Sequence, residues 1–256
     1  MISHPEELTI EPVTATRSRL ATQTVEKTYG RRRVVHGVSI EVNGGEVVGL
    51  LGPNGAGKTT TFYMIVGMIR PNQGAILLDG TDITQMPMYK RARLGIGYLP
   101  QEPSIFRGLS VEDNLMAVIE TMPYPRSERR TVLDALLAQL DIAHIRKSMG
   151  YQLSGGERRR VEITRALVAK PKFMLLDEPF AGIDPIAVQD LQAIVRKLKA
   201  QGLGVLITDH NVRDTLSITD RAYVMYEGSI KRAGTAAELA ADTEVREIYL
   251  GSSFTL

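Results

Sequence analysis

A glycine-rich octapeptide between a strand pattern and a helix pattern constrains this chain more than any other feature. The octapeptide, GPNGAGKT, spans residues 52–59 and follows EVVGLL at residues 46–51, an apolar run typical of a buried strand. A helix is expected after it, from residue 58 to about residue 68. Glycines at such a junction let the backbone curl and point its N–H groups inward at an anion. The pattern G-x-x-x-x-G-K-[ST] in this setting predicts a phosphate-binding loop.

Each residue type in this loop has a physical role. Lys58 places a positive charge against the outer phosphates of a nucleotide, and the hydroxyl of Thr59 can ligate the Mg²⁺ ion that neutralises the same oxygens. The residues expected to bind the nucleotide are Gly52, Pro53, Asn54, Gly55, Ala56, Gly57, Lys58, Thr59 and Thr60. The simpler interpretation is a glycine-rich turn without a ligand.

Two acids at the end of a second buried-strand pattern fit the same chemistry. The pattern KFMLLD ends at Asp177 and is followed directly by Glu178. Asp177 is the expected partner of Mg²⁺, bound directly or through water. Glu178 faces differently because successive side chains alternate, and it is the expected general base for an attacking water. Acids at strand ends are often merely solvated, which is the alternative.

A second pair of glycines stands where a helix is expected to begin, in LSGGERRRVEITRAL. Ser154 is a good N-cap, and Glu157 stands in the capping-box position. Gly155 and Gly156 are poor choices for helix stability alone. Their bare N–H groups at the positive end of a helix dipole can hold an anion, so the sequence predicts an anion site here.

The other segments alternate between strand and helix patterns. Strand patterns occur at residues 20–26, 34–42, 74–80, 95–101 and 204–209. A hairpin is expected around Glu227 and Gly228, and a helix with inward-facing apolar residues at about residues 187–198. Thr235 with Glu238 predicts a short C-terminal helix. Strand–helix alternation of this kind favours an open, mainly parallel sheet.

The composition shifts toward helix between about residues 103 and 170. Ser110 with Asp113 forms a capping box before one helix pattern, and Ser127 is expected to cap the next. This stretch therefore predicts a helical insertion within the α/β chain.

Composition also excludes several classes of function. The chain has no cysteine, which excludes disulfides and cysteine-based metal or redox sites and favours a reducing compartment. Its net charge is only +2, so no overall field favours nucleic acid as a partner. No apolar run approaches the roughly 18 to 20 residues of a membrane span, and the first residues do not form a secretory signal. Residues 1–18 are expected to be a flexible N-terminal tail.

Taken in order, these motifs resemble those of the ATP-binding-cassette (ABC) ATPases, from about residue 20 to the C-terminus. By this resemblance, Tyr29 matches the aromatic residue that stacks on adenine, and Gln101 matches the Q-loop glutamine, which also serves the Mg²⁺ site. Glu178 matches the catalytic glutamate after the Walker B strand. Asp184 in AGID matches the D-loop, and His210 matches the switch histidine.

The resemblance implies an α/β P-loop NTPase fold of ABC type, with the ATPase domain at residues 19–256. It has a mainly parallel core sheet, an N-terminal antiparallel β region, and a helical subdomain inserted between the Q-loop and the signature motif. ATP and Mg²⁺ are the implied cofactors. A homodimer, or a pairing with a similar subunit, is also implied, because in this family the signature caps the γ-phosphate held by a second subunit. The signature residues acting in trans are Ser154, Gly155, Gly156 and Glu157.

Simpler interpretations exist for the isolated motif residues. Tyr29, next to a basic run, can be a solvated strand-end aromatic residue, and Gln101 can be a strand-end polar residue. His210 can be a structural cap. Asp184, directly before a proline, can be an ordinary helix start.

The segment after the Q-loop narrows the resemblance. The strings QEPSIFRGLS, ITDHNVRDTLSITD and VREIYLGSSFTL closely resemble the ATPases of lipopolysaccharide export systems. The alternative is an ATPase of branched-chain amino-acid importers, which typically carry Asn where this chain has Asp184. The resemblance implies two integral membrane permease subunits of LptF and LptG type, whose coupling helices contact Phe106 and Arg107. An exposed Phe after a strand is otherwise a local core plug.

This assignment also implies a location and limits the partners. The chain would lie in the cytoplasm, on the cytoplasmic face of the inner membrane, and would power the extraction of lipopolysaccharide. It would contact neither nucleic acid nor the lipid itself.

Overall fold

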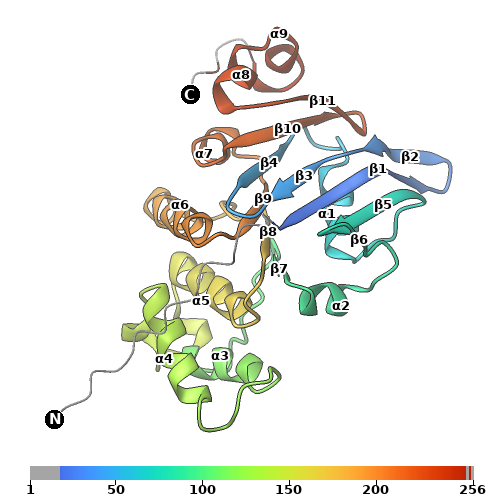
Figure 1. Cartoon of the computed structure of the whole chain (residues 1–256). Helices are drawn as coiled ribbons and strands as arrows, with labels where there is room; N and C mark the ends of the chain where they lie inside the picture. The colour runs from blue at the N-terminus through green and yellow to red at the C-terminus, as the bar shows by residue number, and fades with distance from the viewer. Residues whose placement is uncertain (1–17, 252–253, 255–256) are drawn as a thin grey trace.

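A computed structural model describes residues 18–251 and residue 254 of the chain. The tail expected at residues 1–18 therefore lies outside the described residues, apart from Ser18. Within the described part, the strands form two sheets with helices packed around them (Figure 1).

The core sheet has the strand order β11-β10-β4-β9-β8-β7. Its strands are β4 (Val47–Leu51), β7 (Ile96–Leu99), β8 (Phe173–Asp177), β9 (Gly204–Thr208), β10 (Arg221–Tyr226) and β11 (Ser229–Gly234). The neighbours from β10 to β7 are parallel and only the β10–β11 hairpin is antiparallel, which confirms the mainly parallel sheet. Thr208 pairs with Asp177 on one side and with Leu50 on the other. The loop after β4 and the acids after β8 therefore leave the sheet at the same edge.

Alternate residues of the buried strands face two different layers. On β8, Met174 and Leu176 pack in the cluster that contains α3 (Val111–Ile119), α4 (Arg129–Gln139), α5 (Gly155–Leu167) and α6 (Pro185–Ala200). Phe173 and Leu175 pack on the opposite side, with α1 (Lys58–Val66) and the N-terminal strands. The core sheet is thus the middle layer, and its strands are apolar on both faces, as expected for a parallel sheet covered on both sides.

The N-terminal sheet is antiparallel and has the order β2-β1-β5-β6, with β3 also paired to β1. Its strands are β1 (Arg19–Tyr29), β2 (Arg32–Val38), β3 (Glu41–Asn43), β5 (Gln73–Leu78) and β6 (Thr81–Asp82). The prediction of one strand over residues 34–42 is wrong, because the strand is interrupted between Val38 and Glu41. The cause is Thr22, whose hydroxyl donates to the carbonyl of Val38 and accepts from the N–H of Ile40.

The helices are α1 (Lys58–Val66), α2 (Met88–Arg93), α3 (Val111–Ile119), α4 (Arg129–Gln139), α5 (Gly155–Leu167), α6 (Pro185–Ala200), α7 (Val212–Leu216), α8 (Ala236–Ala241) and α9 (Thr243–Val245). Short turns η1 (Ala143–Ile145), η2 (Gly150–Gln152) and η3 (Arg246–Leu250) complete them. Ser110 caps α3 and Thr235 caps α8, as predicted. Ser127 does not cap α4, which begins after Glu128 without a side-chain cap. The reason is a preceding turn, closed by the Glu128 N–H and the Pro125 carbonyl, that contains Ser127.

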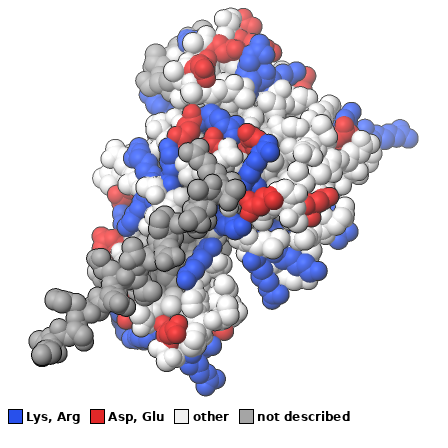
Figure 2. All heavy atoms as spheres, viewed as in Figure 1, with Lys and Arg blue, Asp and Glu red and all other residues white. Residues whose placement is uncertain are grey.

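The helices α3, α4 and α5 lie together at one end of the molecule, in the stretch where a helical insertion was expected (Figure 1). Among the described residues, no helix combines the length and the apolar character needed to cross a membrane. Figure 2 shows acidic and basic side chains interspersed over one face, with Lys and Arg gathered over α2.

Candidate functional site

The loop between β4 and α1 is held tightly by neighbouring backbone. At Gly52, where φ is +145°, an added Cβ would stand 2.1 Å from the carbonyl oxygen of Met225 in β10. At Gly57, where φ is +99°, it would stand 2.8 Å from the carbonyl oxygen of Val34 in β2. Gly57 is also the N-cap of α1, so the N–H groups of this helix open into the loop. The local geometry therefore suits an anion.

Lys58 sits inside this loop rather than in solvent. Its Nζ donates to the carbonyl oxygens of Gly52 at 2.6 Å and Pro53 at 3.0 Å. Burial lowers the pKa of the Lys58 ammonium, and the negative charge of Glu178 partly opposes this change. The positive charge of Lys58 is thus held within the loop. Of the remaining loop residues, Ala56 is buried, Thr60 is half-buried, and Asn54, Gly55 and Thr59 are exposed.

Asp177 is buried at the end of β8, and its two carboxylate oxygens have different surroundings. Its Oδ1 accepts a hydrogen bond from the Thr208 hydroxyl at 2.9 Å. Among the described residues, its buried Oδ2 accepts no hydrogen bond of ordinary geometry, although the Tyr63 side chain interacts with the same carboxyl. Burial raises the pKa of Asp177, although the bond from Thr208 and the interaction with Tyr63 oppose the rise. An unpartnered buried carboxylate oxygen beside a phosphate loop suits a hard divalent cation.

The described residues contain no group of three or more His, Cys, Asp or Glu side chains that could hold a metal alone. A Mg²⁺ ion here would therefore depend on the phosphate oxygens of the nucleotide together with Asp177 and the exposed Thr59. The residues present fit such an ion.

Two side chains from distant parts of the sequence meet at Glu178. Gln101 Nε2, just beyond β7, donates to Glu178 Oε2 at 2.9 Å. His210 Nδ1, just beyond β9, lies 3.2 Å from the same oxygen. The backbone of Glu178 has a φ of +44°, which is uncommon for a residue other than glycine and costs on the order of 1–3 kcal/mol. This strained backbone turns its carboxylate, unlike that of Asp177, toward a partly open space.

His210 is not a helix cap, so that simpler interpretation is wrong. The N-cap of α7 is Asn211, whose side chain accepts from the N–H of Asp214. The sequence reasoning missed Asp209, which is fully buried and lies 3.5 Å from His210 Nδ1. Its carboxylate also accepts from the N–H of Phe180 at 3.0 Å, which ties the loop after Glu178 to β9. An acid directly before the histidine was the available signal.

The signature helix α5 begins as predicted. The Ser154 hydroxyl accepts from the Glu157 N–H, and Glu157 Oε2 accepts from the Ser154 N–H, which makes a complete capping box. Hydrogen bonds of the Glu157 carboxylate with the side chain and the backbone N–H of Ser154 lower the pKa of Glu157.

The two signature glycines have different surroundings. An added Cβ at Gly156 would stand 2.9 Å from the Cβ of Ala187 in α6, which is closer than side chains pack. At Gly155 the nearest atom would be a methyl of Ile183 at 3.6 Å, an ordinary contact. Gly156 is therefore required for helix packing, whereas packing does not require Gly155.

Tyr29 and Asp184 agree with their simpler interpretations. Tyr29 ends β1, is 47% exposed, and has the Lys27 ammonium 5.2 Å from its ring centroid. Asp184 caps α6 through hydrogen bonds from the N–H groups of Ile186 and Ala187. Neither observation tests a role at a nucleotide.

Phe106 is not a core plug. The preceding Ile105 enters the core, whereas Phe106 is 50% exposed and has the Arg165 guanidinium 4.9 Å from its ring centroid. The buried Asn114 fixes this loop, since it accepts from the N–H of Phe106 and donates to its carbonyl. Arg107 is exposed beside it.

Comparisons with known proteins place this geometry in context. Residues 35–181 match the sequence model of a family described as ABC transporter. The chain is 61% identical over 246 residues to a probable ABC transporter ATP-binding protein of Azorhizobium caulinodans, covering 96% of this chain and 87% of the relative. It is 56% identical over 237 residues to the lipopolysaccharide export system ATP-binding protein LptB of Acidithiobacillus ferridurans, covering 93% and 98%. A solved ATP-binding cassette of an ABC transporter in its ADP conformation matches with a TM-score of 0.82 and 31% identity, covering 92% and 99%.

Proposed function

This chain belongs to the ABC transporter family, and from that membership we propose that it is the ATP-hydrolysing subunit of a lipopolysaccharide export system. The meeting of Gln101 and His210 at Glu178 is the observation that carries the hydrolytic function. The likeness to LptB over 93% of the chain supports the cargo.

In the proposed mechanism, the loop after β4 binds the ATP phosphates. The N–H groups at the start of α1 and the Lys58 ammonium would exchange the carbonyl contacts of Lys58 for phosphate oxygens. Tyr29 would stack on the adenine, which its exposed ring permits. Thr59, Gln101 and Asp177 would hold Mg²⁺, which supplies positive charge to the phosphate oxygens when bound.

Glu178 accepts a proton from the attacking water in this mechanism. A general base of this kind contributes about 10²- to 10⁴-fold to the rate. Gln101 and His210 orient the carboxylate by their contacts with Oε2, and buried Asp209 holds the loops that carry Glu178 and His210. His210 would also contact the γ-phosphate.

Two copies of the chain would form one active unit. Ser154, Gly155 and the capped start of α5 present N–H groups at the positive end of a helix dipole. In a head-to-tail homodimer this surface would meet the γ-phosphate held by the partner, with Asp184 near the junction. Each site would then be complete only in the dimer.

The partners of this dimer are proposed to be two integral membrane permease subunits of LptF and LptG type, on the cytoplasmic face of the inner membrane. Their coupling helices would contact Phe106 and Arg107. The exposed ring of Phe106, with Leu109 at 38% and Tyr151 at 60% exposure, supports an apolar contact here. No lipid need touch this chain.

The hydrolytic assignment is tested with Glu178→Gln. We expect this variant to bind ATP, to accumulate as an ATP-bound dimer, and to turn over about 10²-fold or more slowly. The matched control is Glu120→Gln, which alters an exposed carboxylate at the end of α3 and should leave the rate unchanged. A Glu178→Gln rate equal to wild type would refute the assignment.

The docking assignment is tested with Phe106→Ala. The isolated variant should keep its basal ATPase activity and should no longer co-purify with the membrane subunits. Met68→Ala removes an apolar side chain of similar exposure, 49%, and serves as the control. Undiminished co-purification of Phe106→Ala would remove the docking proposal.

The cargo is tested by depleting the chain from cells. Loss of newly made lipopolysaccharide from the cell surface supports export. Loss of leucine uptake with normal surface lipopolysaccharide would instead favour a branched-chain amino-acid importer.

A further inference from the structure

The signature helix α5 carries a buried ion pair that the proposed hydrolysis does not use. Arg159 Nη1 lies 3.0 Å from Glu162 Oε2, and the side chains are 7% and 0% exposed. Burying two charges is costly, and such a pair is often no better for stability than apolar residues of the same size. Its other contacts are therefore informative.

Both members of the pair bind the segment of residues 100–105, here called the Q-loop. Arg159 Nη1 donates to the Pro100 carbonyl at 2.8 Å, and Nη2 donates more weakly to the Gln101 carbonyl at 3.4 Å. The cation thus takes the carbonyl groups at the start of the Q-loop.

Glu162 takes the N–H groups at the other end of the same segment. Its Oε1 accepts from the N–H of Ser104 at 2.6 Å and from that of Ile105 at 3.1 Å. The positive charge of Arg159 thus binds backbone carbonyl groups of the Q-loop, and the negative charge of Glu162 binds backbone N–H groups. Both ends of the Q-loop are therefore fixed to α5. Hydrogen bonds to charged groups are the strong ones, at about twice a neutral bond.

Gln101 links this arrangement to the catalytic carboxylate. Its carbonyl accepts from Arg159, while its side-chain Nε2 donates to Glu178 Oε2 at 2.9 Å. The position of the amide on Glu178 is consequently set by the position of α5.

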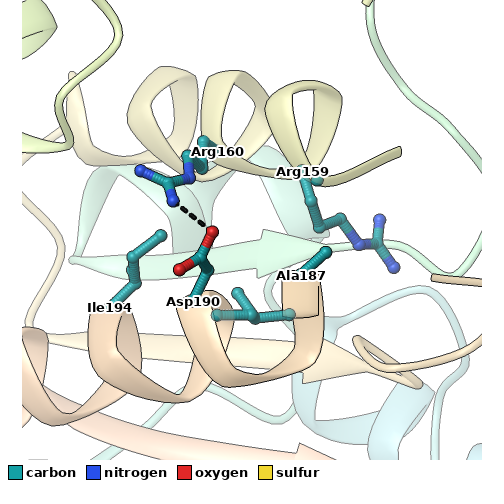
Figure 3. A pocket seen from close by; sticks show the side chains of 7 residues that line it. Arg159, Arg160, Ala187, Asp190 and Ile194 are labelled. Carbon is teal, nitrogen blue, oxygen red and sulfur yellow. Dashed lines mark hydrogen bonds and ion pairs between the residues drawn. The ribbon is translucent and has the colours of Figure 1, made fainter. Parts of the chain in front are cut away.

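The neighbouring arginine points in another direction. Figure 3 shows Arg160 directed at Asp190 on α6, with an Nη2–Oδ2 distance of 2.5 Å, whereas Arg159 extends away from that pair. The Arg160–Asp190 pair is partly exposed, with side-chain exposures of 25% and 49%. Two adjacent residues of α5 thus bind the helix to two different parts of the molecule.

We propose that Arg159 and Glu162 are positioning residues that hold Gln101 against Glu178 from the signature helix. The proposal rests on the proposed function, in which the start of α5 engages the nucleotide of the partner copy. Because the same helix fixes the Q-loop, a shift of α5 upon that engagement moves Gln101 relative to Glu178. The pair therefore couples the state of one nucleotide site to catalytic alignment in the other.

The main test is Glu162→Gln, which keeps the shape of the side chain and removes its charge. Misplacing a catalytic group by about 1 Å can lower activity about 10²-fold, and we expect a loss of about 10- to 100-fold in kcat. Binding of a fluorescent ATP analogue to the isolated chain should be unchanged, because the loop after β4 is untouched. Asp190→Asn breaks the other ion pair of α5 and should keep the wild-type kcat. A wild-type kcat in Glu162→Gln would overturn the proposal.

A double-mutant cycle with Gln101→Ala separates positioning from general stability. If Glu162 acts through Gln101, the double variant turns over no more slowly than Gln101→Ala alone. Losses that multiply would overturn the proposal, because they would show an effect independent of Gln101. If Glu162→Gln melts below the assay temperature, Arg159→Lys, which keeps the charge but not the fork of donors, enters the same cycle.

The cycle also distinguishes the failure of this proposal from that of the proposed function. A wild-type rate in Gln101→Ala would remove the role of the Q-loop in hydrolysis and the positioning proposal with it. A slow Gln101→Ala together with a fast Glu162→Gln would overturn the positioning proposal alone.

Discussion

Replacing each signature glycine by alanine separates their two roles. At Gly156, the new Cβ would stand 2.9 Å from the Cβ of Ala187, whereas carbon atoms pack best at about 3.5–4.0 Å. Helices α5 and α6 must therefore move apart or tilt. At Gly155 the corresponding distance is 3.6 Å, which requires no adjustment.

The magnitude follows from comparing the two variants. Overpacking of this kind costs about 1–3 kcal/mol. Each alanine also gains at most about 1 kcal/mol of helix propensity over glycine. This gain is similar at the two neighbouring positions, so it largely cancels when the stabilities of the two variants are compared. Gly156→Ala should thus be about 1–3 kcal/mol less stable than Gly155→Ala, or about 2–12 °C lower in Tm for a domain of this size.

The assay is thermal unfolding of both variants, followed by ATPase rates at saturating ATP. Gly155→Ala should fold as stably as wild type and still lose most of its activity, because its methyl group would lie among the N–H groups proposed to bind the partner's phosphate. Equal Tm values for the two variants would refute the packing argument. A wild-type rate in Gly155→Ala would refute the anion role.

Two further predictions concern buried charges. Arg91 is 1% exposed and donates to four backbone carbonyl oxygens, at the end of α1 and just before α2. A buried acceptor left without its donor costs about 1–3 kcal/mol, so Arg91→Met should lower the free energy of unfolding by at least about 3 kcal/mol. Urea unfolding measures this loss, and a loss within the error of the method would contradict it. Burial raises the pKa of Asp177 above its unfolded value of about 3.9. The contribution of this carboxyl to the free energy of unfolding is therefore fully present below the unfolded-state pKa. It is lost as the pH rises through the raised pKa of the folded state. Asp177→Asn should accordingly have a higher Tm than wild type at neutral pH, and this difference in Tm should shrink in acid. The variant should have no hydrolytic activity. A lower Tm than wild type at neutral pH would contradict the prediction.

Local signals predicted the elements that local chemistry determines. The capping box of Ser154 and Glu157, and the strand, loop and helix around Lys58, depend on residues close in sequence. The break after Val38 depends on Thr22, which lies on another strand, so no local pattern indicates it.

Helix α2 was not predicted because it exposes its large apolar side chains and buries a charged one, the reverse of an ordinary surface helix. Its apolar residues Met88 and Tyr89 are exposed, whereas the residue that it buries is Arg91. Periodicity of apolar residues therefore gives no signal there.

The candidate site was more predictable than the roles within it. Gln101, Glu178 and His210 carry recognisable motifs, and the parallel sheet brings their strand ends together. Sequence could not tell that Gly156 packs on Ala187 while Gly155 does not, because that difference depends on the approach of α6.

The most direct measurement is the ATPase rate per chain as the protein is diluted, with the molecular mass recorded at each concentration. If half of every catalytic pocket is supplied by a second copy, the rate per chain falls in proportion to the dimer fraction and vanishes for single chains. A constant rate per chain in solutions that contain only monomers would contradict the account.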